Sequence, residues 1–154
     1  MSQSRLGRVV VAPLILPHEL AHALIPTIAG YSWTIHVLPD WDGAGTPLGQ
    51  FDMVVDDTTP LWVIRLAALA PLPLYLSVAV LLGVFELGGA VALAAILFCA
   101  FSGTLSGGDL AVATQPAAAR ASGEFVVTPA GWERTASDVL TAATTVVIAL
   151  LIIG

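Results

Sequence analysis

The sequence predicts an all-α transmembrane protein, a bundle of about four membrane helices with a small β-hairpin inserted between helices 1 and 2. Composition points to this class, because 57% of the 154 residues are apolar and only 10% are charged. A soluble domain usually carries about a quarter charged residues. The mean hydropathy of +0.91 agrees. Residues 1–154 are therefore expected to form a single integral-membrane domain, multi-pass in the cell membrane and surrounded by the lipid bilayer.

Four segments have the length and composition of membrane spans. A membrane helix needs about 20 mostly apolar residues. The segments that qualify are residues 9–30, 61–83, 88–114 and 137–153. Pro60 and Gly83 bracket the second segment, and Pro116 closes the third. Prolines inside the first two segments are expected to kink them, and the freed carbonyls must find partners within the protein.

The polar insertion at residues 31–57 has the periodicity of strands. Apolar and polar residues alternate from Tyr31 to Val37 and, less cleanly, from Gln50 to Val55. A stretch rich in glycine and proline, residues 42–47, separates the two runs. This pattern predicts a β-hairpin with a long loop. A further short strand is predicted at residues 124–128.

The first span contains the motif His18-Glu19-Leu20-Ala21-His22. Residues four apart project from one face of a helix, so both imidazoles can reach one zinc ion, and the Glu beside it can take a proton from bound water. A charged residue near the centre of a membrane helix costs about 2.5–3.5 kcal/mol on insertion scales. Helices can pack with Ser, Thr or Gly at a much lower insertion cost, so the motif indicates a functional site.

Asp109 is the candidate for the third zinc ligand. A catalytic zinc usually has three protein ligands, and two histidines leave one position to fill. Asp109 lies inside the third span and is the only acidic residue between Glu86 and Glu124. A lone buried carboxylate is costly without a cation. The depths also agree, because His22 and Asp109 lie about 12 Å and about 9 Å from the corresponding ends of their spans.

These features together resemble the site-2 protease group of intramembrane zinc metalloproteases. The Gly-Gly-Asp109 context is similar to small zincin peptidases related to that group. The resemblance covers the first three spans. It implies that His18, His22 and Asp109 bind zinc and that Glu19 is catalytic. Better-known members place an Asn and prolines before a Leu-Asp-Gly, whereas this chain has Ser-Gly-Thr-Leu-Ser-Gly-Gly-Asp at residues 102–109.

The predicted function is hydrolysis of peptide bonds in or near transmembrane segments, with one Zn2+ per chain and Glu19 as general base. The partner is then a membrane-protein or peptide substrate. A net charge of −6 with only five basic residues argues against nucleic acid. The alternatives are a membrane metal-ion transporter and a catalytically inactive scaffold that binds zinc. The orientation and the oligomeric state are left open.

Other polar and aromatic residues have plainer interpretations. His36 falls on the polar face of its predicted strand, which favours a solvated side chain over a second metal site. Arg65 is expected to reach the membrane interface rather than a transition state. The four tryptophans lie near span ends, as interfacial anchors do.

Overall fold

The computed structural model describes residues 5–38 and 48–154. Within that part of the chain, seven helices and one antiparallel strand pair form, so the protein is mostly helical, as predicted. The elements in order are α1 (Arg5–Ala29), β1 (Trp33–Val37), β2 (Gly49–Met53), α2 (Leu61–Leu69), α3 (Pro71–Gly83), α4 (Gly89–Gly103), α5 (Gly107–Thr114), α6 (Pro116–Ser122) and α7 (Gly131–Ile153).

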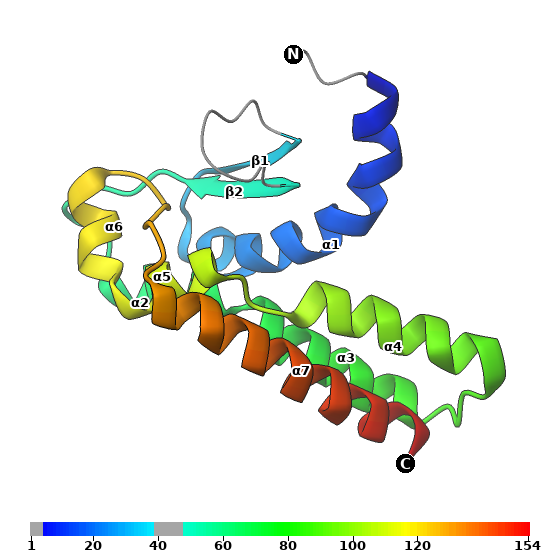
Figure 1. Ribbon diagram of the computed structural model, residues 1–154. Helices are drawn as coiled ribbons and strands as arrows, with labels where there is room; N and C mark the ends of the chain where they lie inside the picture. Colours follow the sequence, from blue (N-terminus) through cyan, green and yellow to red (C-terminus); the bar gives the residue numbers. More distant parts are fainter. Residues whose placement is uncertain (1–4, 39–47) are drawn as a thin grey trace.

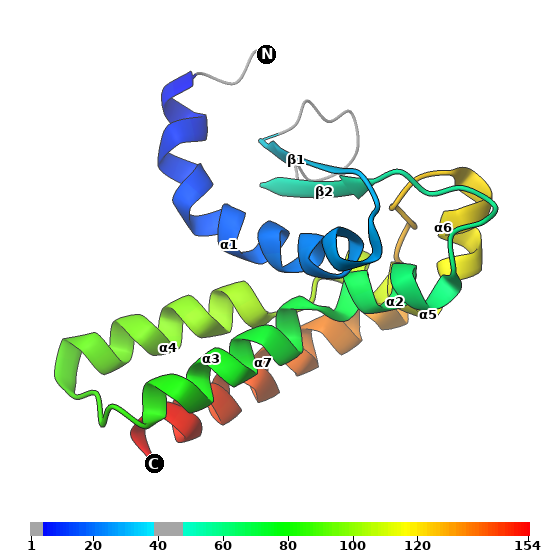
Figure 2. The ribbon, with the colours of Figure 1, turned by 180° about the vertical axis from the view of Figure 1, so that it is seen from behind.

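Three helices lie side by side along the molecule: α3, α4 and α7 (Figure 1). Their shared core includes Tyr75, Ala79, Cys99 and Ile148. Beyond one end of these helices, α2, α5, α6 and the strand pair gather around a second core. Helix α1 contacts elements of both groups. It bends strongly along its length (Figures 1 and 2), as expected for a helix with internal prolines at positions 13 and 17.

The second predicted span is two helices rather than one. α2 and α3 meet at a bend of 44°. The bend coincides with Pro71, the first residue of α3. Proline has no backbone N–H and its ring crowds the preceding turn, so the helix kinks there.

The third predicted span is also broken, with a 43° bend between α4 and α5. α4 ends at Gly103, and Thr104 and Ser106 have extended backbones. Ser106 then starts α5 with a capping box: its hydroxyl accepts from the N–H of Asp109, and its own N–H donates to the Asp109 carboxylate. Both bonds satisfy backbone or side-chain groups that a new helix start would otherwise leave unpaired.

These breaks mean that the predicted four-helix membrane bundle is not confirmed. Among the described helices, only α7 is by itself long and apolar enough to cross a membrane. Counting each bent pair as one span raises the number to three at most. α7 also starts earlier than the predicted fourth span, at Gly131, where Glu133 caps its first turn by accepting from the N–H of Ala130.

Large apolar side chains cover the outer faces of the long helices. On α4, Leu93 and Leu97 are 57% and 60% exposed, and on α7, Val146 and Leu150 are 60% and 64% exposed. Further exposed examples include Leu81, Val91, Phe98, Phe101 and Val139. A soluble monomer rarely exposes contiguous apolar surface on this scale, whereas lipid would cover it without cost.

The predicted β-hairpin pairing is confirmed, with shorter strands. β1 and β2 pair antiparallel with Trp33 opposite Met53 and Val37 opposite Gly49. The connecting residues 42–47 lie outside the described residues. The strand predicted at residues 124–128 is wrong. That segment has no strand partner; instead Phe125 is buried against Phe51, with ring centroids 5.2 Å apart, and holds the segment by packing.

Candidate metal centre

Helix α1 presents two histidines side by side. His18 and His22 are one turn apart, their ring centroids are 4.7 Å apart, and their Nε2 atoms are 3.1 Å apart. His22 is only 2% exposed. Its ring also lies against the second core, 5.7 Å from the Phe51 ring. The spacing predicted from the motif is therefore realised on one face of α1.

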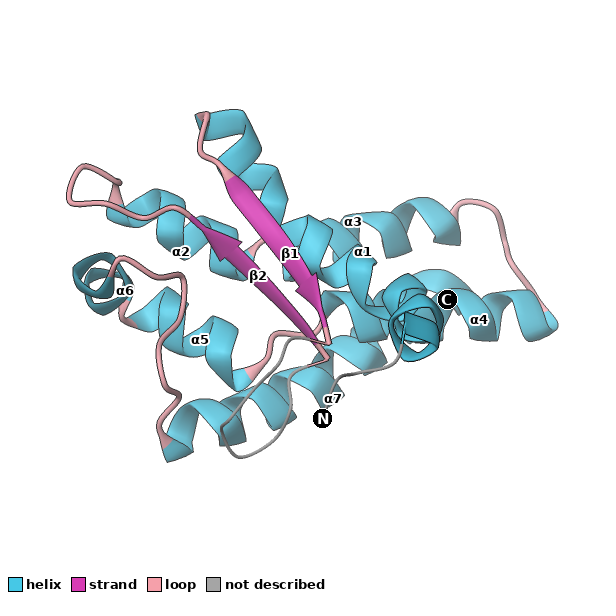
Figure 3. Cartoon of the chain, turned by 90° about the horizontal axis from the view of Figure 1, so that it is seen from above, coloured by secondary structure: helices cyan, strands magenta, loops and turns pink. Residues whose placement is uncertain are grey.

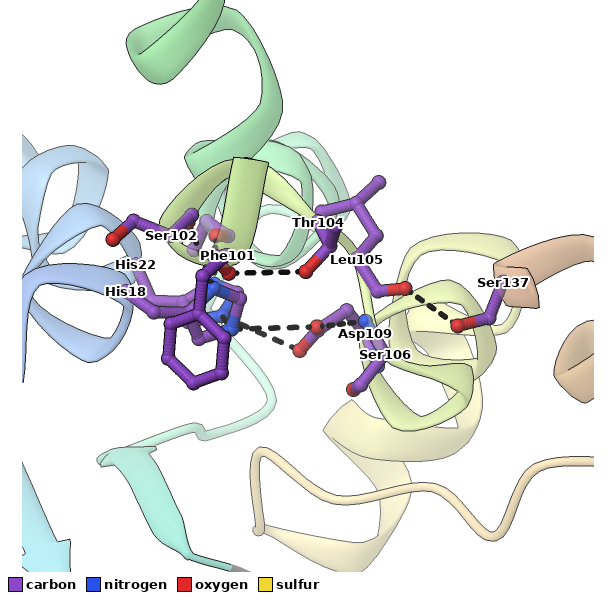
Figure 4. Close-up of polar contacts among 10 residues, drawn as sticks. His18, His22, Phe101, Ser102, Thr104, Leu105, Ser106, Asp109 and Ser137 are labelled. Atoms are coloured by element: carbon purple, nitrogen blue, oxygen red, sulfur yellow. Dashed lines mark hydrogen bonds and ion pairs between the residues drawn. The ribbon is translucent and has the colours of Figure 1, made fainter. Parts of the chain in front are cut away.

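Asp109 comes from α5 and faces the same point (Figure 4). Its Oδ1 lies 3.3 Å from His22 Nε2, and its Oδ2 lies 3.7 Å from His18 Nε2. The structure thus brings the three predicted ligands into one cluster that can hold a metal ion. Asp109 does not lie within a continuous helix, as the sequence suggested, but in the first turn of a new one.

The hydrogen bonds behind the two rings decide what the cluster can bind. His18 Nδ1 lies 3.0 Å from the carbonyl oxygen of Ser102, and His22 Nδ1 lies 2.8 Å from that of Ala67. A carbonyl only accepts, so each Nδ1 carries a proton and donates it. When the rings are neutral, each Nε2 is therefore unprotonated and carries a free lone pair. Such bonds at the second nitrogen are what fixes the tautomer of a metal-binding histidine.

Two lone pairs and a carboxylate therefore face one another. With both rings neutral, this arrangement is repulsive unless a cation lies between the three groups. Four ligands at about 2.0–2.1 Å around a tetrahedral zinc are about 3.3 Å from one another. The two Nε2 atoms are 3.1 Å apart, and a different oxygen of Asp109 lies near each of them, Oδ1 at 3.3 Å from His22 and Oδ2 at 3.7 Å from His18, so these separations are close to that value. Two imidazoles and a carboxylate are also a donor set that zinc accepts, so the residues fit the ion.

Glu19 lines the same cavity as the three metal-binding candidates. The cavity has a volume of about 440 Å³, and Glu19 is only 7% exposed. β2 lies directly against it. A Cβ on Gly49 would come 2.5 Å from Glu19 Oε1 and would also overlap Ile15, so any larger residue would push the carboxylate aside.

Several residues at the cavity were not predicted from the sequence. Helix α7 contributes Ser137 and Thr141 to the wall, and Ser137 donates to the carbonyl of Leu105 at 2.7 Å. Phe125 contributes from the segment before α7. The pattern Ser106-Gly-Gly-Asp109 was a usable signal that was missed, because a serine three residues before an acid is typical of a capping box.

The plainer interpretations of the other residues can also be compared with the structure. His36 is exposed on β1, 3.5 Å from the Thr34 hydroxyl, and belongs to no cluster of metal-binding side chains among the described residues. Arg65 donates from Nε to the Ala113 carbonyl at 2.9 Å, so it caps the end of α5. Trp62 and Trp132 are exposed, as anchors would be, while Trp41 lies outside the described residues.

No protein-family model matches the chain, and neither the curated proteins nor the solved structures include a match. A function is therefore inferred from the geometry of this site.

Proposed function

We propose that the chain is an intramembrane zinc metallopeptidase. In this proposal His18, His22 and Asp109 hold one zinc ion, and Glu19 is the general base. The observation that carries it is the convergence of two imidazole lone pairs and a carboxylate on one point of a cavity that Glu19 also lines. The resemblance of the motifs to site-2 proteases leads to the same reaction.

The proposed role of each residue follows from its chemistry. A zinc ion held by these ligands would supply a Lewis acid that makes bound water acidic near neutral pH. Glu19 accepts a proton from water as the oxygen attacks the carbonyl carbon of the substrate peptide bond. When the carbon–nitrogen bond breaks, Glu19 returns that proton to the leaving amine. The buried position of Glu19 keeps its carboxylate away from competing solvent.

The proposed substrates are membrane-protein segments. α7 can cross a membrane, and the apolar faces of α3, α4 and α7 are exposed along their length. If each bent pair crosses the membrane as one span, the protein is multi-pass, and its cavity lies between membrane helices. Peptide bonds that reach such a cavity come from segments within or next to the bilayer.

The two alternatives are less well supported. A transporter needs successive binding sites along a path, and the described residues contain a single group of metal-binding side chains. An inactive scaffold would keep the three ligands, but it has no need of a buried glutamate in the same cavity.

The outer edge of β2 is suited to hold an extended substrate. The N–H of Leu38 donates to Leu48, and the N–H of Val54 donates to Ser32. In this antiparallel register, the backbone groups of residues 48, 50, 52 and 54 face β1, so those of Gly49 and Phe51 face away from it, and the Phe51 N–H is directed at the Glu19 carboxylate. Both residues line the cavity, and β2 is the strand nearer to α5 and α6 (Figure 3).

Ester substitution in a peptide substrate tests this edge. A substrate strand paired with β2 would use the N–H groups of alternate residues. Replacing one such amide by an ester removes the donor, and we expect cleavage efficiency to fall about three- to tenfold, as for a typical net hydrogen bond. Esters at the intervening residues are the matched controls and should leave cleavage efficiency unchanged. Equal effects at all positions, or none, would mean that β2 does not pair with the substrate.

The experiment that tests the proposed function uses the wild-type protein in detergent or lipid nanodiscs. We expect about one zinc ion per chain, consistent with a single three-ligand site, and cleavage of a peptide substrate containing a membrane segment. Zinc without cleavage of any membrane-segment substrate would favour the scaffold. Zinc flux across sealed vesicles would favour the transporter. Protein without zinc would contradict the metal site itself.

A further inference from the structure

Two backbone carbonyls that orient the histidines are free for an identifiable reason. In a continuous helix, each carbonyl accepts from the N–H four residues later. For Ala67 that residue is Pro71, which has no N–H. For Ser102 it is Ser106, whose N–H donates to the Asp109 carboxylate at 2.7 Å instead. Both positions lie at the bends between paired helices.

These are the same carbonyls that accept from the histidine rings. The Ala67 carbonyl accepts a hydrogen bond from the Nδ1–H of His22, and the Ser102 carbonyl accepts one from the Nδ1–H of His18. The Ala67 carbonyl also accepts from the N–H of Ala70 at 3.3 Å, which leaves its second lone pair for the ring. The N–H released at the second bend, that of Ser106, orients the third side chain. All three metal-binding candidates are thus held by groups that the two bends release.

The backbone around Pro71 shows what the proline prevents. Ala70 has helical dihedral angles, φ −55° and ψ −36°. An N–H at position 71 would therefore point back along the helix towards the Ala67 carbonyl. It would compete with His22 Nδ1 for that oxygen and tend to straighten the bend. Pro71 is buried, so the position cannot relax by turning outward.

We infer that the two helix breaks form the supporting shell of the metal site, and that Pro71 is a positioning residue that keeps the Ala67 carbonyl available to His22. The inference rests on the proposed metal site. Loss of a group that orients a metal-binding histidine typically weakens metal affinity about 10–100-fold. A proline thus acts on the metal through a carbonyl and a ring, without touching either the metal or the substrate.

Zinc affinity of proline variants tests this role. Pro71→Ala restores the N–H, and Pro71→Val restores it while filling more of the buried volume. For both we expect the zinc dissociation constant, measured by competition with a chelator, to rise about 10–100-fold. Pro73→Ala is the matched control, because Pro73 is exposed in the same turn of α3, and the carbonyl four residues before it, that of Leu69, is not one of the two that accept from a histidine ring. Its zinc affinity should equal that of the wild type.

A structural role alone would not move the second readout, which is the ¹⁵N NMR signal of the His22 Nδ1–H. In the zinc-bound wild type this proton should be protected from exchange by the Ala67 carbonyl. In the Pro71 variants it should exchange faster, while the thermal stability of the metal-free protein stays close to that of Pro73→Ala. A wild-type affinity and a protected proton in both Pro71 variants would overturn the role of Pro71.

Should the Pro71 variants fail to fold, the second bend gives an independent test. Ser106 has φ −69°, which suits proline. Ser106→Pro removes the N–H that holds Asp109, whereas Ser106→Ala keeps it and loses only the hydroxyl. Zinc affinity should fall further in Ser106→Pro than in Ser106→Ala; equal affinities would overturn the inference. A wild-type protein that binds no zinc would instead refute the proposed metal site, and this inference with it.

Discussion

Glu19→Gln should abolish peptide cleavage while the protein retains one zinc ion per chain. Glutamine has the shape of glutamate but no basic oxygen, so it cannot accept the proton of the attacking water. General acid–base catalysis by a positioned side chain contributes about 10²–10⁴-fold, and the rate should fall by at least that range. Zinc should stay, because the glutamate is not among the three side chains of the metal cluster.

The close packing around Glu19 supplies a second variant with the same expected direction. Gly49→Ala would place a Cβ 2.5 Å from Glu19 Oε1, so the carboxylate must shift. Cleavage should drop while zinc is retained. Gly131→Ala is the control, because a Cβ there meets nothing within 4 Å. Zinc content by mass spectrometry and cleavage by gel assay are the measurements. Wild-type cleavage in Glu19→Gln would remove this residue from the reaction.

The two histidines could be predicted because their spacing is encoded at short range. The spacing of His18 and His22 needs only a helix, and α1 is helical through both residues. Asp109 needed a second argument, its isolation among apolar residues in a later segment. That argument was sufficient because a carboxylate among apolar residues must find a cation or hydrogen-bond donors, and in the structure Asp109 lies beside both histidines and accepts from the N–H of Ser106.

The predicted spans were less accurate because hydropathy averages over local backbone chemistry. Residues 61–83 and 88–114 are mostly apolar, so a hydropathy average over each segment does not detect the breaks at Pro71 and Ser106. The sequence does contain a signal for each break: Pro71 for the first and the capping-box pattern that starts at Ser106 for the second. The strand predicted at residues 124–128 failed for another reason. The alternation of apolar and polar residues correctly indicates that Phe125 is buried. Whether a partner strand lies beside it depends on the tertiary structure.

The supporting groups could not be predicted, because they are backbone atoms. The Ala67 and Ser102 carbonyls hold the histidine rings, yet nothing in the identity of an alanine or a serine marks its carbonyl as special. Glu133 is a similar case. It is fully buried in α7 and accepts from Thr114 and Gln115 at the end of α5, which ties the two helices together. Such contacts depend on how helices distant in sequence meet.

Removing any one metal ligand should lower the zinc affinity more than substituting a residue that only orients a ligand. His18→Ala, His22→Ala and Asp109→Ala each leave two protein ligands, one fewer than a catalytic zinc site normally has. The zinc affinity should fall by more than the factor of about 10–100 that is expected for a supporting residue. Most of the zinc should therefore dissociate during purification. His36→Ala is the matched control, since the third histidine of the chain is exposed on β1 and should not affect zinc content.

Asp109 needs a finer variant, because its carboxylate also caps α5. Asp109→Ala removes the cap together with the ligand, so a loss of zinc could reflect a frayed helix. Asp109→Asn keeps an oxygen that accepts from the N–H of Ser106, so α5 should keep its start, but its neutral amide is a poorer zinc ligand. We therefore expect Asp109→Asn to fold like the wild type, by circular dichroism and thermal unfolding, and still to lose most of its zinc. Full zinc occupancy in Asp109→Asn and Asp109→Ala together would show that α5 supplies a cap alone, and that the third ligand lies elsewhere.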